Sequence, residues 1–188
     1  MSNQIFIIEN FIEPEDAQII INEINHPSEF NPYPEFYNNR NGGTALPYNK
    51  ITVSMLKKYG EKANKKIQEL FNLDENIYAT KGYSSHWETG NEGPPHVDDI
   101  EKEPFIQWST VIYLNEPPEF EGGVIYFPQK NFKYVPVKYS AVLFPQKNSS
   151  YIHGITKVTS GHRYTLLFHH CSDIAFADPD ILEAKNDN

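Results

Sequence analysis

From Ile77 onward the chain is a succession of short apolar and aromatic segments, and this pattern constrains the fold more than any other feature. The segments are separated by turn residues such as Glu92-Gly93-Pro94-Pro95 and Glu121-Gly122-Gly123. Short strands at regular intervals are typical of β-sandwiches and jelly rolls. We predict strands over residues 77–87, 105–114, 124–127, 132–137, 140–144, about 151–153 and 162–169.

The residues before this region predict a short edge strand and two helices. The edge strand is the apolar run from Gln4 to Ile8. A helix is expected from Pro14 to about Ile24, because proline fits a first helical turn and the two acidic residues after it complement the positive helix end. An amphipathic helix is expected from about Thr52 to Phe71.

Helices followed by a run of short strands indicate an α+β fold, with a jelly-roll core (a double-stranded β-helix) buttressed by N-terminal helices. A length of 188 residues fits a single domain spanning 1–188, with its core at about 77–171. Residues 27–49 are rich in Pro, Asn, Tyr and Gly. This segment fits a mobile lid that contacts substrate and fits a plain exposed linker equally well.

Composition excludes several classes of function. Net charge is −9, from 16 basic and 25 acidic residues, and no basic run stands out, which disfavours nucleic-acid binding. Cys171 is the only cysteine, so no intrachain disulfide can form and a reducing compartment is favoured. The first ten residues do not have the pattern of a signal peptide, and no apolar run is long enough to span a membrane. We predict a cytoplasmic protein that binds no membrane.

The triplet His96-Val97-Asp98 is the strongest local signal for a metal site. Side chains alternate along a strand, so His96 and Asp98 share a face and can supply two adjacent ligands. A third ligand is expected from His153, and two histidines with one carboxylate leave three positions open, as in non-haem iron(II) oxygenases. Taken alone, a His-x-Asp triplet arises often by chance.

Arg163 opens an apolar strand, where a buried guanidinium needs an anionic partner. A dicarboxylate would suit its planar fork of donors, and Thr165 on the same face could add a hydrogen bond. The alternative is that Arg163 lies at a strand edge, paired with one of the many acidic side chains.

Together these features match a family. The stretch from Tyr83 to His169 resembles the catalytic core of prolyl-4-hydroxylase-like, Fe(II)- and 2-oxoglutarate-dependent dioxygenases. It presents, in the family order, Trp87-x-x-Gly90, His96-x-Asp98, Tyr113-Leu114-Asn115, Glu121-Gly122-Gly123-x-x-x-Phe127-Pro128, Pro136, His153, Gly161 and Arg163.

The resemblance implies a role for each matched residue. His96, Asp98 and His153 would be the catalytic iron ligands, and Arg163 would pair with the distal carboxylate of 2-oxoglutarate. Tyr113 would help to hold that carboxylate. Trp87 stands where many members have a tyrosine facing the cosubstrate; Tyr83, earlier on the same strand face, could take that part.

The implied activity is hydroxylation of a prolyl or other side chain in a protein or peptide, with succinate and CO2 as coproducts. The cofactors would be Fe(II) and 2-oxoglutarate, with ascorbate as an optional addition. Alternatives are an oxygenase acting on a free amino acid or small metabolite, a non-catalytic jelly-roll binding module, and a zinc hydrolase. The intact triad together with Arg163 argues against the binding module.

The other histidines carry weaker signals. His169-His170-Cys171 looks like a soft-metal cluster, but adjacent strand residues face opposite ways, so the two histidines are not expected to share a metal. His26, His86 and His162 are expected to be structural or solvated.

Overall fold

The computed structural model describes residues 4–26, 50–98, 104–146 and 149–182. Its strands are β1 (Phe6–Ile8), β2 (Tyr78–Glu88), β3 (Gly93–His96), β4 (Trp108–Tyr113), β5 (Phe120–Glu121), β6 (Ile125–Phe127), β7 (Phe132–Tyr134), β8 (Ala141–Pro145), β9 (His153–Ile155) and β10 (Ser160–Cys171). Its α-helices are α1 (Pro14–Asn25), α3 (Lys50–Phe71) and α4 (Pro179–Leu182). Short 3-10 turns cover Pro128–Lys130, Ser149–Tyr151 and Ile174–Phe176.

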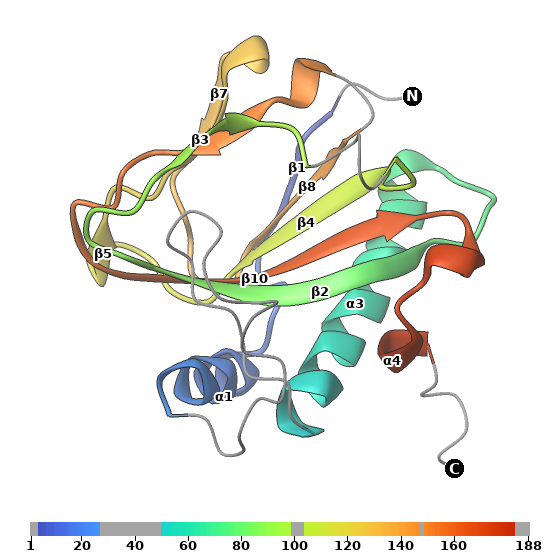
Figure 1. Ribbon diagram of the computed structural model, residues 1–188, viewed down its shortest axis with the longest axis horizontal. Helices are drawn as coiled ribbons and strands as arrows, with labels where there is room; N and C mark the ends of the chain where they lie inside the picture. Colours follow the sequence, from blue (N-terminus) through green and yellow to red (C-terminus); the bar gives the residue numbers. More distant parts are fainter. Residues whose placement is uncertain (1–3, 27–49, 99–103, 147–148, 183–188) are drawn as a thin grey trace.

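The strands form two antiparallel sheets (Figure 1). The larger sheet has the order β1-β8-β4-β10-β2, with β5 paired to β10, and the smaller has the order β3-β9-β6-β7. One apolar cluster joins side chains of both sheets, from β4 and β8 on one side and from β6 and the segment before β9 on the other. It contains Val111, Tyr113, Ile125, Phe127, Val142, Phe144 and Tyr151. This pair of facing sheets is the predicted jelly-roll core.

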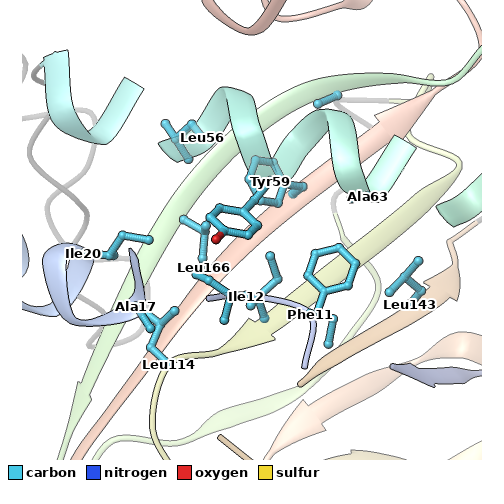
Figure 2. Close-up of a cluster of buried hydrophobic side chains, with 14 of the residues drawn as sticks. Phe11, Ile12, Ala17, Ile20, Leu56, Tyr59, Ala63, Leu114, Leu143 and Leu166 are labelled. Carbon is cyan, nitrogen blue, oxygen red and sulfur yellow. The ribbon is translucent and has the colours of Figure 1, made fainter. Parts of the chain in front are cut away.

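The opposite face of the larger sheet is covered by the helices, which lie below β2 and β10 in Figure 1. Helix α1 begins at Pro14 and turns Ala17 and Ile20 inward, one helical turn apart. Helix α3 buries residues at the same spacing, among them Leu56 and Ala63. Figure 2 shows these side chains converging with Leu143 and Leu166 of the sheet. The α+β prediction is confirmed.

Two strands were not expected from the sequence. Residues 92–95 and 121–123 were assigned to turns, whereas Gly93–His96 form β3 and Phe120–Glu121 form β5. The turn prediction for 92–95 is wrong because β3 lies at the edge of its sheet, where prolines that cannot donate a ladder hydrogen bond are tolerated.

The other predicted elements were found with shifted ends; the strand predicted at 132–137, for example, ends at Tyr134. The predicted lid at 27–49 lies outside the described residues. In the part of the chain that the structure describes, no helix is both long and apolar enough to cross a membrane.

Candidate metal centre and anion site

The three predicted ligands lie together at the edge of the smaller sheet. His96 ends β3, His153 begins β9, and the two residues are cross-strand partners with ring centroids 4.7 Å apart. Asp98 follows β3 by two residues. Its Oδ1 atom lies 3.6 Å from Nε2 of His96 and 3.9 Å from Nε2 of His153. The spacing predicted from a shared strand face is therefore realised, although Asp98 lies just past the strand end.

Both imidazoles turn Nε2 toward this carboxylate, and the Asp98 side chain raises the pKa of His96. Nδ1 of His96 lies 2.8 Å from the carbonyl oxygen of Pro94, and Nδ1 of His153 lies 3.2 Å from that of Tyr151. A carbonyl only accepts, so each Nδ1 carries the hydrogen and each Nε2 of a neutral ring carries a lone pair. Burial lowers the pKa of His153, which favours its neutral form. When both rings are neutral, three electron-rich atoms face one another, and the carboxylate oxygen lies too far from both nitrogens for a hydrogen bond, an arrangement that a divalent cation would bridge.

The other oxygen of Asp98 is held by a buried polar network. Oδ2 accepts hydrogen bonds from the Ser109 hydroxyl at 2.9 Å and from the Gln146 amide. Nδ1 of His169 lies 3.7 Å from Oδ2 and 3.0 Å from the Ser109 oxygen. Burial raises the pKa of Asp98, but the neighbouring side chains of His96, His169, His153 and Ser109 outweigh it, so the pKa lies below its usual range. The carboxylate is therefore ionised and fixed in orientation.

Sequence reasoning missed Ser109, Gln146 and His169. Ser109 and His169 are polar residues within otherwise apolar strands, and this is the one signal that the sequence offers. In the structure they face each other across β4 and β10. A polar pair inside otherwise apolar strands needs a partner. That partner, Asp98, could not be identified without the fold.

Arg163 is buried within the larger sheet, with 2% of its surface exposed. Its Nε donates to the carbonyl oxygen of Gly123 at 3.0 Å, while Nη2 has no hydrogen-bond partner among the described residues. Gly123 permits this contact: a Cβ atom there would lie 2.7 Å from Cδ of Arg163. Among the described residues Arg163 forms no ion pair, so the alternative of an edge arginine paired with an acidic side chain does not hold there.

Tyr113 presents a second buried donor beside Arg163. The guanidinium carbon lies 5.3 Å from the Tyr113 ring centroid, and the Tyr113 hydroxyl has no hydrogen-bond partner in the described part of the chain. Burial raises the pKa of Tyr113 to about 12, so the hydroxyl keeps its proton and can donate it. Two buried donors, one of them cationic, thus lack an acceptor at the same place.

Three further predicted residues lie on the same face of β2 and β10 as Arg163, namely Trp87, Thr165 and Tyr83. The Trp87 ring lies 5.9 Å from the guanidinium carbon, and its indole N–H donates to Ser85. Ser85 also bonds the Thr165 hydroxyl at 2.8 Å. Tyr83 bonds Nε2 of His169 at 3.2 Å, and His169 belongs to the network around Asp98.

The adjacent histidines of β10 point to opposite faces, as expected from the sequence. His169 belongs to the network around Asp98, whereas His170 bonds Asn64 of α3 and Thr110 of β4. Burial lowers the pKa of His170 to about 3, so this ring is neutral and structural.

Comparison with known proteins gives a consistent picture. A model of the 2OG-Fe(II) oxygenase superfamily matches residues 80–169, the stretch that contains the triad, Tyr113 and Arg163. No curated protein sequence matches the chain.

Several solved structures share the fold. A viral collagen prolyl hydroxylase from Paramecium Bursaria Chlorella virus-1, in complex with 2OG, superposes with a TM-score of 0.65 and 16% identity, covering 90% of this chain and 96% of that one. A prolyl-4-hydroxylase from Pseudomonas putida gives 0.63 and 16%, covering 92% and 94%. A Trichoplax adhaerens prolyl hydroxylase, bound to a peptide fragment of a hypoxia inducible factor, gives 0.61 and 16%, covering 91% and 84%. At these identities the likeness concerns the fold.

Proposed function

We propose that this chain is a 2OG-Fe(II) oxygenase that hydroxylates a side chain in a protein or peptide. The match of residues 80–169 to a model of the 2OG-Fe(II) oxygenase superfamily supports this proposal. The cofactor is Fe(II), the cosubstrate is 2-oxoglutarate, and succinate and CO2 are the coproducts. The residues for these groups are His96, Asp98 and His153 for the metal, with Arg163 and Tyr113 for the distal carboxylate.

The observation that carries this proposal is the pair of unpartnered donors on Arg163 and Tyr113. A buried guanidinium without an anion is costly, whereas a bound carboxylate would accept from both groups in a charge-assisted hydrogen bond. A zinc hydrolase would need the metal ligands, and a simple binding module would need the fold. Neither of them would need this buried cation.

Some residues of the chain would bind the cosubstrate, and others orient the proposed metal ligands. When bound, iron(II) and 2-oxoglutarate would supply the electrons that activate dioxygen, and 2-oxoglutarate would be oxidised to succinate and CO2. Arg163 and Tyr113 would fix one end of the cosubstrate, and Ser109 and Gln146 hold the Asp98 carboxylate in place. His153 packs against Phe127 and Phe144, which keep water from that side of the centre.

One side of the centre remains open to a substrate. The His96 side chain is 46% exposed, whereas that of His153 is 8% exposed. Access to the metal is therefore from the edge of the smaller sheet, where a peptide can approach. Among the solved relatives, the Trichoplax adhaerens enzyme is bound to a peptide fragment, which supports a peptide substrate.

The activity is tested by measuring succinate formed from 2-oxoglutarate with Fe(II) in air. We expect turnover by the native chain and its loss in His153→Ala and Asp98→Ala, with native circular dichroism. His26→Ala, at an exposed histidine outside the triad, is the matched control and should keep full turnover. Full activity in both triad variants would overturn the metal assignment.

Substrate class needs a separate measurement. Candidate proline-containing peptides and free amino acids are incubated with the enzyme and analysed by mass for the gain of one oxygen atom. Oxygen gain on a peptide supports the proposal. Oxygen gain only on a free amino acid or metabolite would favour the small-molecule alternative.

A further inference from the structure

A second group of metal-ligating side chains lies on the face of the larger sheet opposite Arg163. It consists of His86 and Glu88 on β2 and His162 on β10, whose ligand atoms all lie within 4.8 Å of one another. In the register of the two strands, His162 faces Glu88 and Tyr164 faces His86. Because side chains alternate, these residues share one face, while Arg163 and its partner Trp87 share the other.

The two imidazoles of this group have the spacing of neighbouring metal ligands. Nε2 of His86 lies 2.9 Å from Nδ1 of His162. Zinc–nitrogen bonds of about 2.1 Å at angles between about 90° and 110° separate two ligand nitrogens by about 3.0–3.4 Å. The same pair can share one hydrogen as an N–H···N bond, which a metal ion would replace with little movement of either ring.

The histidine at the inner end of the group is fixed in place and favours the neutral form. His86 stacks on Tyr164 with centroids 4.5 Å apart, and the Tyr164 hydroxyl donates to Asn25 of α1. Burial, and then the nearby His162, lower the pKa of His86. A neutral imidazole held in one orientation is the form that binds a metal.

The carboxylate of the group can complete the site. Glu88 is exposed, and among the described residues no lysine or arginine forms an ion pair with it. Its side chain is long and lies at the surface, so it can rotate onto an ion held by the two rings, while water fills the remaining positions.

We propose that His86, Glu88 and His162 form a second metal site, distinct from the triad, that binds a late first-row divalent ion such as Zn²⁺. Imidazole nitrogens with one carboxylate oxygen suit this class of ion. The ion would link β2 to β10 directly behind Trp87 and Arg163. Its role would be structural: it clamps the two strands that carry the anion site. This goes beyond the proposed oxygenase function and does not depend on it.

Counting bound zinc in a set of variants tests the site. The full-length protein is loaded with excess Zn²⁺, passed through a desalting column, and its metal content is measured by mass spectrometry. We expect two ions per chain in the native protein, one in Asp98→Ala, one in His162→Ala and none in the double variant. His26→Ala, at an exposed histidine outside the group, should keep both ions.

The count separates failure at this site from failure at the triad. An ion that is lost on His162→Ala in the Asp98→Ala background supports the proposal whatever the triad binds. If Asp98→Ala retains no zinc, or if His162→Ala retains as much as the native protein, the proposal is wrong.

A milder variant tests the site even if His162→Ala does not fold correctly. Glu88→Gln keeps the shape of the side chain and removes its charge, and it should weaken zinc binding at least as much as loss of an outer-shell partner, about 10- to 100-fold. In the Asp98→Ala background, zinc at about 100 times its dissociation constant should raise the melting temperature by about 5–10 °C. The same rise in Asp98→Ala/His162→Ala would contradict the assignment.

Discussion

At the scale of single residues, the orientation of Asp98 depends on groups that lie outside the proposed set of metal ligands. The Gln146 amide donates both to Oδ2 of Asp98 and to the Ser109 hydroxyl. Gln146→Met keeps the volume and removes both bonds, so the carboxylate gains freedom that metal binding must then remove. We expect Fe(II) or Mn(II) affinity to fall about 10- to 100-fold, measured by equilibrium titration. Gln68→Met removes a side-chain hydrogen bond to the Glu75 carbonyl outside this network and should leave the metal affinity unchanged. An unaltered affinity in Gln146→Met would reject the positioning role.

Arg163 carries a buried charge that no acidic side chain of the described residues compensates. Arg163→Met removes a buried cation that has no acidic partner among the described residues, so the ligand-free protein should melt at the same temperature or higher. The loss of a buried charged donor should raise the 2-oxoglutarate concentration for half-maximal succinate release about 100-fold or more. Arg163→Lys keeps the charge without the planar fork, so its 2-oxoglutarate requirement should lie between those of the native protein and Arg163→Met. A lower melting temperature with an unchanged 2-oxoglutarate requirement would show that Arg163 is purely structural.

The sequence identified the residues to which the proposed function assigns a direct chemical role, and it did not identify the residues that contact them. The triad and Arg163 occur at recognisable spacings, and the structure brings the three ligands together as the strand period indicates. Ser109 and Gln146 reach Asp98 only through the pairing of strands that are distant in sequence. His86 and His162, which were expected to be structural or solvated, meet because β2 and β10 are neighbours. Contacts of this kind depend on topology, which local patterns do not encode.

At the scale of elements, most helices and strands could be predicted because each buries a periodic apolar face. Strand β3 could not, since its sequence Gly-Pro-Pro-His has no apolar alternation and only Gly93 is buried. It pairs with β9 through few backbone contacts around the His96–His153 pair. A short edge strand of this composition forms because the rest of the jelly roll presents β9 to it, and this short strand carries His96, a proposed metal ligand.

Helix α1 is joined to α3 by a charged contact that depends on pH. Asp16 accepts hydrogen bonds from Lys58 at 2.6 Å and from the Tyr59 hydroxyl at 2.5 Å. Burial raises the pKa of Asp16, but these two hydrogen bonds outweigh it and hold the pKa below its usual value. The contact therefore stabilises the fold above the unfolded pKa of about 4 and is lost as the pH falls through the lower folded value.

Asp16→Asn should therefore lower the melting temperature at pH 7 by about 2–4 °C, since a partly screened contact of this kind contributes about 1 kcal/mol. The difference from the native protein should shrink as the pH is lowered below about 4, because the native carboxyl is then protonated as well. Glu15→Gln, an exposed neighbour in the same helical turn, is the control for the loss of one negative charge. A difference that does not vary with pH would show that the carboxylate charge is irrelevant.

The packing of α3 on the sheet depends on a glycine in β2. A Cβ atom at Gly82 would lie 2.8 Å from the Phe168 ring and 2.9 Å from the Leu56 side chain. Gly82→Ala should therefore cost about 1–3 kcal/mol and lower the melting temperature by about 2–12 °C. Adding Phe168→Leu should restore part of the loss, because the shorter side chain makes room. If the two effects simply add, the steric explanation is wrong.

At the scale of the whole molecule, the two faces of the larger sheet have separate roles. The inner face holds Arg163 and Tyr113 and packs against the smaller sheet that carries His96 and His153. The outer face packs against α1 and α3 and, past their cover, carries the His86–Glu88–His162 group. Because neighbouring residues of one strand serve both faces, a change in the spacing of β2 and β10 alters the anion site and the outer group together.

Net charge should influence which peptides the enzyme prefers. The chain carries −9, so its long-range field attracts cationic peptides and repels anionic ones. For two peptides with the same acceptor residue, one flanked by lysines and one by glutamates, kcat/KM should favour the lysine peptide by about 10-fold at low ionic strength. The preference should narrow at about 0.5 M salt, where screening acts over only a few ångströms, and a peptide with uncharged flanks should fall between the two at low salt. Because charged side chains at the site itself act over short distances that salt screens weakly, a preference that salt leaves unchanged would place selectivity in local contacts and exclude the overall field as its cause.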